Sequence, residues 1–253
     1  MTTAIATQTE HIVIDQNDLP VELTRVFQSQ ITPMGKPTPE QLRLMNQYRP
    51  MRIPEYTADE LISVPLMASN NLLTWGQSRW AIAAVQKMAD TYPGKPMLLN
   101  HNDYDVKESV GFVYDAQVIY SNAVPQDVLD GAGETEYNEA VVRAEGFYQL
   151  VAYAAISVNH PILDALRYAR VGNVSTGCIT DGTYRCPLDG TEFDMSRMRC
   201  AEGHYHPYAR WWFNLDEGDV VAPYYIKDGV ISSYELSFVV AGNLPAASIP
   251  KAG

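Results

Sequence analysis

Short strand-like segments separated by turns dominate this chain, and they constrain its fold more than any other feature. Residues 108–120 alternate in character, with Val110, Phe112, Tyr114 and Ala116 on one face, which is typical of a strand. Residues 147–156 are continuously rich in β-forming residues, which predicts a buried strand. Because turns and not regular helical crossovers join neighbouring segments, the pattern favours a mostly antiparallel sheet or barrel with a few packed helices.

The remaining segments fit the same α+β, mainly β architecture. Further expected strands are residues 60–68, 96–99 and 174–180, and the expected helices are residues 75–91 and 161–169. Residues 220–227 and 230–240 flank Asp228-Gly229, so we expect them to form a hairpin. This order argues against a doubly wound parallel fold, and the lack of a glycine-rich phosphate loop leaves nucleotide chemistry unsupported.

The pattern also suggests how the chain is divided. Its 253 residues suffice for one substantial domain with extensions. Residues 1–55 are mixed in character, and we interpret them as an N-terminal arm or extension. Residues 56–250 are then the main domain. Within it, glycine, cysteine, histidine and charged residues interrupt the strand pattern at residues 181–210, which predicts an inserted loop.

Charge and composition narrow the functional classes. A net charge of −12 argues against a surface that follows nucleic-acid phosphates, so we expect no nucleic-acid partner. No apolar run approaches the length of a membrane span, and the first residues lack the regions of a signal peptide. The expected location is therefore a cytoplasm. Three cysteines do not make a disulfide framework in that compartment.

Three separated residues could together supply the groups that acyl transfer needs. His101 ends an apolar segment, Ser175 lies beside a glycine in a strand-like segment, and Glu235 opens an alternating segment. A base, a hydroxyl nucleophile and an orienting acid are the parts of a catalytic triad. Each residue also has an ordinary interpretation: a turn histidine, a small residue chosen for packing and a solvent-facing acid. His160, which precedes Pro161, is a rival base or an ordinary residue at a helix start.

Three stretches surround these residues: residues 98–103 (LLNHND) with 109–113 (SVGFV), residues 173–178 (NVSTGC) and residues 234–247 (YELSFVVAGNLPAA). Taken in order, these stretches resemble the capsid maturation (prohead) proteases of tailed phages. The second of these is similar to the Val-Ser-Ile-Gly-Phe nucleophile strand of that family, although Thr176 and Cys178 replace apolar residues. The third is similar to a Glu-Val-Ser-Leu-Val strand with a tail of small residues.

The resemblance implies both a fold and a function. The family shares an antiparallel β-barrel with the herpesvirus assemblin proteases, so a barrel with packed helices is the expected fold. The implied activity is a serine endopeptidase with His101, Ser175 and Glu235 as its triad, which needs no cofactor for catalysis. The implied substrates are scaffold and major capsid protein, cleaved inside the procapsid in the host cytoplasm; a homo-oligomer is compatible with this. The oxyanion-hole donors are expected near residues 167–172.

The inserted loop contains residues that could bind a metal. Cys186, Cys200, His204 and His206 could provide two sulfur and two nitrogen ligands for Zn²⁺. Some proteases of the family carry a Cys-x-x-Cys…Cys-x-His insertion here, and this loop resembles a reduced version in which Asp189 holds the second cysteine position. Such a zinc would be structural, because a short irregular loop lacks a core of its own. The alternative is a metal-free loop with free thiols.

Two other functions remain open at this level. One is a non-enzymatic virion or assembly protein that keeps the same barrel, and the other is a metal-binding interaction module. Geometry separates them, because a protease needs His101 within hydrogen-bond reach of Ser175. Cys178 is expected to be a buried small apolar residue.

Overall fold

The computed structural model describes residues 31–239, except for residues 75, 125–127, 129–131, 133–134 and 169–170. The helices are α2 (Pro39–Gln47), α3 (Ile82–Thr91), α5 (Thr135–Glu145), α6 (Ile162–Arg167) and α7 (Ala209–Trp212), with a short 3₁₀ helix at Val106–Glu108. The strands are β1 (Leu61–Asn70), β2 (Ser78–Trp80), β3 (Pro96–Leu99), β4 (Gly111–Ser121), β5 (Phe147–Ser157), β6 (Asn173–Thr180), β7 (Tyr184–Arg185), β8 (Phe193–Asp194), β9 (Arg199–Cys200), β10 (Tyr225–Lys227) and β11 (Val230–Val239).

The central element is a six-stranded sheet in the order β1-β5-β4-β3-β11-β6. Neighbouring strands are antiparallel except for β3 and β11, which are parallel. A three-stranded sheet (β2-β10-β7) and a two-stranded sheet (β8-β9) complete the described strands. None of these sheets closes on itself, so the expected antiparallel β-barrel is wrong, and the fold is α+β with mixed sheets. Alternation of apolar residues predicts that a strand is present, but not the direction or partner of that strand.

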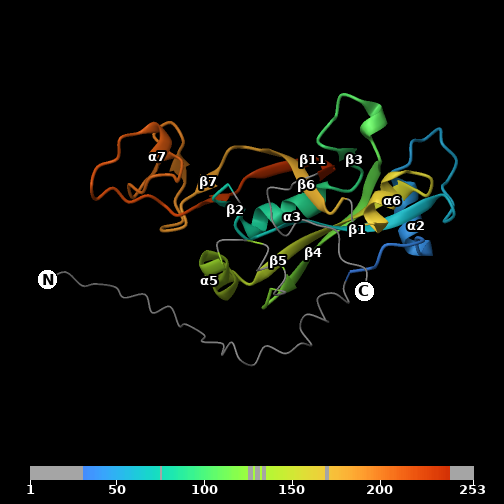
Figure 1. The fold of residues 1–253 in the computed structure, drawn as a ribbon, viewed down its shortest axis with the longest axis horizontal. Helices are drawn as coiled ribbons and strands as arrows, with labels where there is room; N and C mark the ends of the chain where they lie inside the picture. Colours follow the sequence, from blue (N-terminus) through green and yellow to red (C-terminus); the bar gives the residue numbers. More distant parts are fainter. Residues whose placement is uncertain are drawn as a thin grey trace.

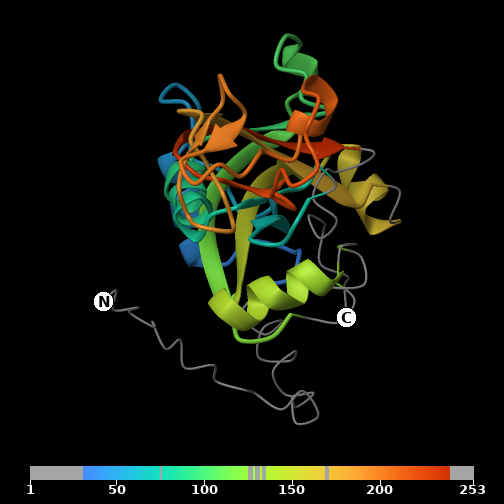
Figure 2. The same ribbon diagram turned by 90° about the vertical axis from the view of Figure 1, so that its left-hand side faces the viewer.

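The central sheet is buried on both faces along β5, which confirms the buried strand expected at residues 147–156. Leu150, Ala152 and Ala154 pack in a core with α3, whereas Val151 and Tyr153 pack in a second core on the other face. Met45 of α2 belongs to this second core and is fully buried. Figure 2 shows α3 end-on and α5 lying across the molecule away from it.

Local signals explain where the helices begin. Thr38 caps α2 through a capping box with Gln41, and Pro39 takes the first helical position, as expected for a helix start. The predicted helix at residues 75–91 is shorter than expected, because its first part forms β2 and only Ile82–Thr91 is helical. The expected arm of residues 1–55 is described only from residue 31, and the division at residue 55 stays a prediction.

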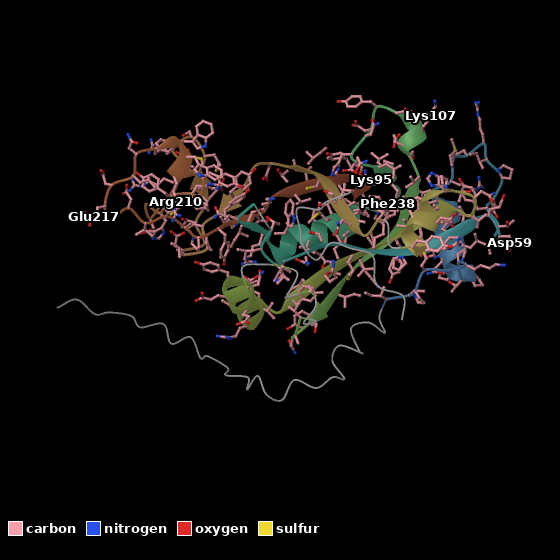
Figure 3. All side chains as sticks on the ribbon, viewed as in Figure 1. Asp59, Lys95, Lys107, Arg210, Glu217 and Phe238 are labelled. Carbon is pink, nitrogen blue, oxygen red and sulfur yellow. The ribbon has the colours of Figure 1, made fainter. Side chains whose placement is uncertain are left out.

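The segment between β6 and β10 (residues 181–224), called the Cys/His lobe below, lies at one end of the molecule. Figure 1 shows α7 there, with α2 and α6 towards the opposite end. Figure 3 places Arg210 and Glu217 in the lobe and Phe238 of β11 in the main body. The hairpin expected around Asp228-Gly229 is wrong, since β10 pairs with β2 and β7 while β11 pairs with β3 and β6.

Candidate active site and metal group

His101 lies in a tight turn directly after β3. Asn100 and His101 have positive φ angles of 49° and 59°, and the Asn102 N–H donates to the carbonyl of Leu99 at 3.0 Å. Two consecutive positive φ values are those of a type I′ turn, which favours glycine, asparagine or aspartate at both positions. A histidine in this conformation lowers the stability of the folded protein, and surrounding contacts must offset this strain. The Asn100 N–H donates to the Phe238 carbonyl at 2.9 Å, so β11 fixes this turn.

The structure brings His101 and Glu235 into direct contact. The distance from His101 Nδ1 to Glu235 Oε1 is 2.8 Å. Glu235 is 1% exposed, whereas the His101 side chain is 43% exposed. The second carboxylate oxygen, Oε2, accepts a hydrogen bond from Ser237 Oγ at 2.5 Å. A buried carboxylate bonded to Nδ1 leaves the other ring nitrogen, Nε2, on the half-exposed side chain to act as a base.

Ser175 lies on the same face of the sheet as this pair. In the β6–β11 register Ser175 is opposite Ser237, and Gly177 is opposite Glu235. Directly opposed residues on antiparallel strands point to one face, with Cβ atoms about 4.5–5.5 Å apart. Within the described part of the chain, no hydrogen bond joins Ser175 to His101. Catalytic hydrogen bonds of this kind are often long in structures without substrate.

A β-bulge in β11 sets the direction of Glu235. The register shifts between Ser233 and Glu235, so Tyr234 is the extra residue. Ser233 therefore points to α3, where its Oγ donates to the Met88 carbonyl at 3.3 Å. Glu235, two residues later, points to the opposite face and reaches His101. Bulges commonly re-aim a side chain in this way beside a functional site.

Gly177 provides the space that the Glu235 carboxylate occupies. A Cβ atom built on Gly177 would lie 2.1 Å from Glu235 Oε1 and 2.8 Å from the Tyr234 ring. Both distances are below any real contact of a Cβ atom. Glycine is thus required at this position for a close approach between a strand backbone and a buried side chain.

Replacing Gly177 with alanine should therefore displace the carboxylate from His101. Overpacking at a buried site costs about 1–3 kcal/mol of unfolding free energy, and the lost contact should slow any reaction that uses His101. Thermal melting and reaction rate would be compared with Gly35→Ala, because nothing lies within 4 Å of a Cβ atom at Gly35. Wild-type stability and rate in the Gly177 variant would contradict this role.

The other sequence candidates lie elsewhere. The ring nitrogen Nδ1 of His160 accepts a hydrogen bond from the Ile162 N–H at 3.2 Å, at the start of α6, and burial lowers the pKa of this histidine. The segment proposed for the oxyanion hole, residues 167–172, lies partly outside the described residues. Cys178 is half-buried beside the main core, and burial raises the pKa of its thiol.

The Cys/His lobe contains four side chains close enough together to bind a metal ion. Ligand atoms of Cys186, Asp189, Cys200 and His204 all lie within 4.8 Å of one another. His204 Nδ1 is 3.6 Å from Cys186 Sγ, 3.5 Å from Cys200 Sγ and 2.9 Å from Asp189 Oδ2. Ligand atoms around tetrahedral zinc lie roughly 3.2–3.8 Å apart. The two distances from His204 Nδ1 to sulfur fall in this range, and the distance to Asp189 Oδ2 is slightly shorter.

Turns at both ends of the β8–β9 hairpin position these ligands. Cys186 follows β7, and its carbonyl accepts a hydrogen bond from the Gly190 N–H at 2.9 Å. Cys200 ends β9, and its Sγ accepts a hydrogen bond from the His204 N–H at 3.3 Å. Burial raises the pKa of the Cys186 thiol to about 11, and a bound divalent cation would reverse this by favouring the thiolate.

His206 is not part of this group, although the sequence suggested it as a ligand. It is 1% exposed, and its ring centroid lies 5.1 Å from that of Phe193 and 4.5 Å from that of Tyr225. Its Nδ1 accepts a hydrogen bond from the Tyr208 N–H at 3.2 Å, and burial lowers its pKa to about 4. Asp189 takes the fourth place instead. The spacing of Cys186-x-x-Asp189 was the signal for this residue, because the carboxylate stands where a second cysteine was expected.

Comparison with known proteins returned no match to a family model, a curated protein or a solved structure. Among the helices of the described residues, none has the length and apolar character needed to cross a membrane.

Proposed function

We propose that this protein is a serine endopeptidase, with Ser175 as nucleophile, His101 as general base and Glu235 as the acid that orients it. One observation carries the proposal: the buried Glu235 carboxylate contacts His101 Nδ1 on the face of the sheet to which Ser175 also points. A structural protein has no need of a buried acid bonded to a half-exposed histidine in a strained turn. Ser237 and Gly177, which the sequence did not single out, complete this arrangement.

The proposed reaction follows from these positions. Ser175 Oγ attacks a peptide carbonyl carbon while His101 Nε2 takes its proton. The imidazolium then gives this proton to the leaving amine, so that the C–N bond breaks and an acyl-enzyme remains. Water hydrolyses the acyl-enzyme with the same base and restores the serine. Glu235 holds Nδ1–H throughout and stabilises the positive ring, because it is buried and stays close to it.

The proposed substrates are the scaffold and major capsid proteins of a tailed-phage procapsid, cleaved during head maturation within the host cytoplasm. The support is the resemblance of three segments of this chain to the prohead proteases. His101 lies in residues 98–103, Ser175 in residues 173–178 and Glu235 in residues 234–247. The described open, mixed sheet differs from the barrel of that family. The substrate assignment therefore needs its own test.

Incubation of the purified protein with the scaffold and capsid proteins of its own virus tests this assignment. We expect discrete fragments with defined new termini, identified by mass spectrometry. Unchanged substrates, in a preparation whose Ser175 reacts with a serine-directed probe, would show that the enzyme acts on other proteins. Unchanged substrates without such reactivity would favour a non-enzymatic assembly protein.

A structural zinc site in the Cys/His lobe is a second proposal, favoured by a separate observation. Cys186, Asp189, Cys200 and His204 bring two sulfurs, one nitrogen and one oxygen together around one point. All four protein ligands fill a tetrahedral shell and leave no open position for substrate, which is typical of a structural site. Elemental analysis should find about one equivalent of zinc per chain. Less than about a tenth of an equivalent, with freely reactive thiols, would contradict the proposal.

A further inference from the structure

Ser237 lies at the centre of the candidate active site, and the proposed reaction leaves it without a task. Its side chain is fully buried, donates to Glu235 Oε2 at 2.5 Å and accepts from the backbone N–H of His101 at 3.1 Å. We propose that Ser237 is a positioning residue that fixes both the acid and the base of the triad. This inference rests on the proposed hydrolase function and deepens it.

The hydrogen bonds of Ser237 separate its task from that of Ser175. A hydroxyl has one proton to donate, and Ser237 directs it to the carboxylate. One of its lone pairs accepts the His101 N–H. The residue is also closed to solvent, whereas Ser175, directly opposite on β6, is half-buried. A peptide substrate could therefore reach Ser175 but not Ser237.

The first effect of Ser237 is on the acid. Each oxygen of the buried Glu235 carboxylate has one partner, His101 Nδ1 on Oε1 and Ser237 Oγ on Oε2. The hydroxyl holds the carboxylate plane in place and shares its negative charge. Hydrogen bonds to charged groups are stronger than those between neutral groups, so this contact has a large influence on the direction of the acid.

The second effect is on the base. His101 has a φ angle of 59°, a conformation that L-residues avoid. The hydrogen bond from its N–H to Ser237 holds the backbone in that conformation, as the bond from the preceding Asn100 N–H to Phe238 does one residue earlier. Ser237 accepts a hydrogen bond from the backbone of His101 and donates one to Glu235, which is bonded to the His101 imidazole. Ser237 therefore links the backbone and the side chain of the histidine through the acid.

Replacing Ser237 with alanine in the full-length protein tests the proposal with two readouts. The first is the rate at which a fluorophosphonate labels Ser175, which forms a P–O bond to Oγ and releases fluoride. We expect this rate to fall about ten- to a hundredfold, the effect of one hydrogen bond to a charged group. Ser237→Thr keeps the hydroxyl on a residue that suits a strand, and it should retain most of the rate.

The second readout is the low-field NMR resonance of the His101 Nδ1 proton, assigned with a His101→Gln variant. This proton lies in the hydrogen bond between His101 Nδ1 and Glu235 Oε1. Without the hydroxyl the Glu235 carboxylate is held by one contact fewer, so this hydrogen bond should lengthen and weaken. We therefore expect the resonance to move upfield and broaden in Ser237→Ala and to stay near its wild-type position in Ser237→Thr.

Ser233→Ala is the matched control. Ser233 is a fully buried serine on the same strand, but it bonds to Met88 and Thr91 on the opposite face. It should lower the melting temperature about as much as Ser237→Ala while leaving both readouts unchanged. An unchanged His101 Nδ1 proton resonance in Ser237→Ala, or a labelling rate within twofold of wild type, would overturn the proposal. If wild-type Ser175 takes up no phosphonate, the hydrolase function fails, and the NMR resonance still decides the role of Ser237.

Discussion

Replacement of Ser175 by alanine is expected to lower the rate of peptide cleavage on the order of 10⁴-fold or more, the loss seen when a triad nucleophile is removed. The physical reason is that the nearest alternative in the described strands, Ser237 directly opposite, cannot attack because it is fully buried and bonded to Glu235. The measurement is the cleavage rate of the wild-type and variant proteins on one substrate, together with covalent labelling by a fluorophosphonate.

The fold should survive this substitution. Removal of one hydroxyl from a half-buried position leaves no large cavity, and substitutions of this kind usually change the unfolding free energy by about 0.5 kcal/mol or less. Ser232→Ala is a matched control, because Ser232 is also half-buried in the central sheet and bonds only to the next carbonyl. Undiminished cleavage by the Ser175 variant would exclude Ser175 as the nucleophile.

Replacement of Glu235 by glutamine accompanies this experiment as a graded comparison. The orienting acid contributes less than the nucleophile, so the loss should be about a hundredfold smaller than for Ser175→Ala. Equal losses in the two variants would indicate that the Glu235 substitution damages the sheet, which a melting curve would reveal.

Some of this arrangement could be predicted from the sequence. The alternation of residues 108–120 and the continuous run of residues 147–156 correctly located β4 and β5. The single face expected for residues 108–120 is wrong, because Val110 and Ala116 pack with the core at α3, whereas Phe112 and Tyr114 pack with the second core. Both signals come from burial, which side-chain type records directly. The strand end before His101 was also visible, because an apolar segment gives way to polar residues there.

The pairing of the strands could not be predicted in the same way. The parallel contact between β3 and β11 joins segments more than a hundred residues apart. Neither segment contains a sequence signal that predicts the other as its partner. The bulge at Tyr234 reverses the face of Glu235, so simple alternation along β11 gives the wrong side for one half of the strand. Gly229 has a positive φ angle of 67°, but the strands on either side of Asp228-Gly229 enter different sheets.

The ligands of the metal group could also be predicted only in part from the sequence. Histidine is the commoner zinc ligand, so His206 was the natural choice over Asp189. The ring of His206 is instead surrounded by Phe193, Tyr208 and Tyr225, and this aromatic environment forms only when the lobe folds. Sequence spacing gives the candidates for a metal site, and tertiary packing selects among them.

Removal of zinc should have the second large effect, and it should be confined to the Cys/His lobe. The buried cluster that holds the lobe consists of Cys186, Phe193, Cys200 and Ala222 of the lobe with Tyr225 of β10. Two of these five residues are proposed ligands, so little apolar surface remains to hold the lobe without the ion. Structural zinc contributes on the order of 10 kcal/mol or more to the folding of small metal-dependent units.

Chelation should therefore make the lobe sensitive to trypsin, with cuts after Arg185, Arg197, Arg199 and Arg210, while the six-stranded sheet stays protected. Cleavage sites would be mapped by mass spectrometry with and without a zinc chelator. Asp189→Ala should lose zinc and become sensitive without chelator. Cys178→Ala, which removes the cysteine of β6 outside the lobe, should keep both zinc and protection.

His206→Phe separates the two candidate ligand sets. Phenylalanine keeps an aromatic ring among Phe193, Tyr208 and Tyr225 but cannot bind a metal. With Asp189 as the fourth ligand, this variant should retain about one equivalent of zinc and the trypsin resistance of the wild type. Loss of zinc from His206→Phe together with its retention in Asp189→Ala would instead place His206 on the ion, which would require the aromatic cluster to open and the ring to turn towards Cys186 and Cys200.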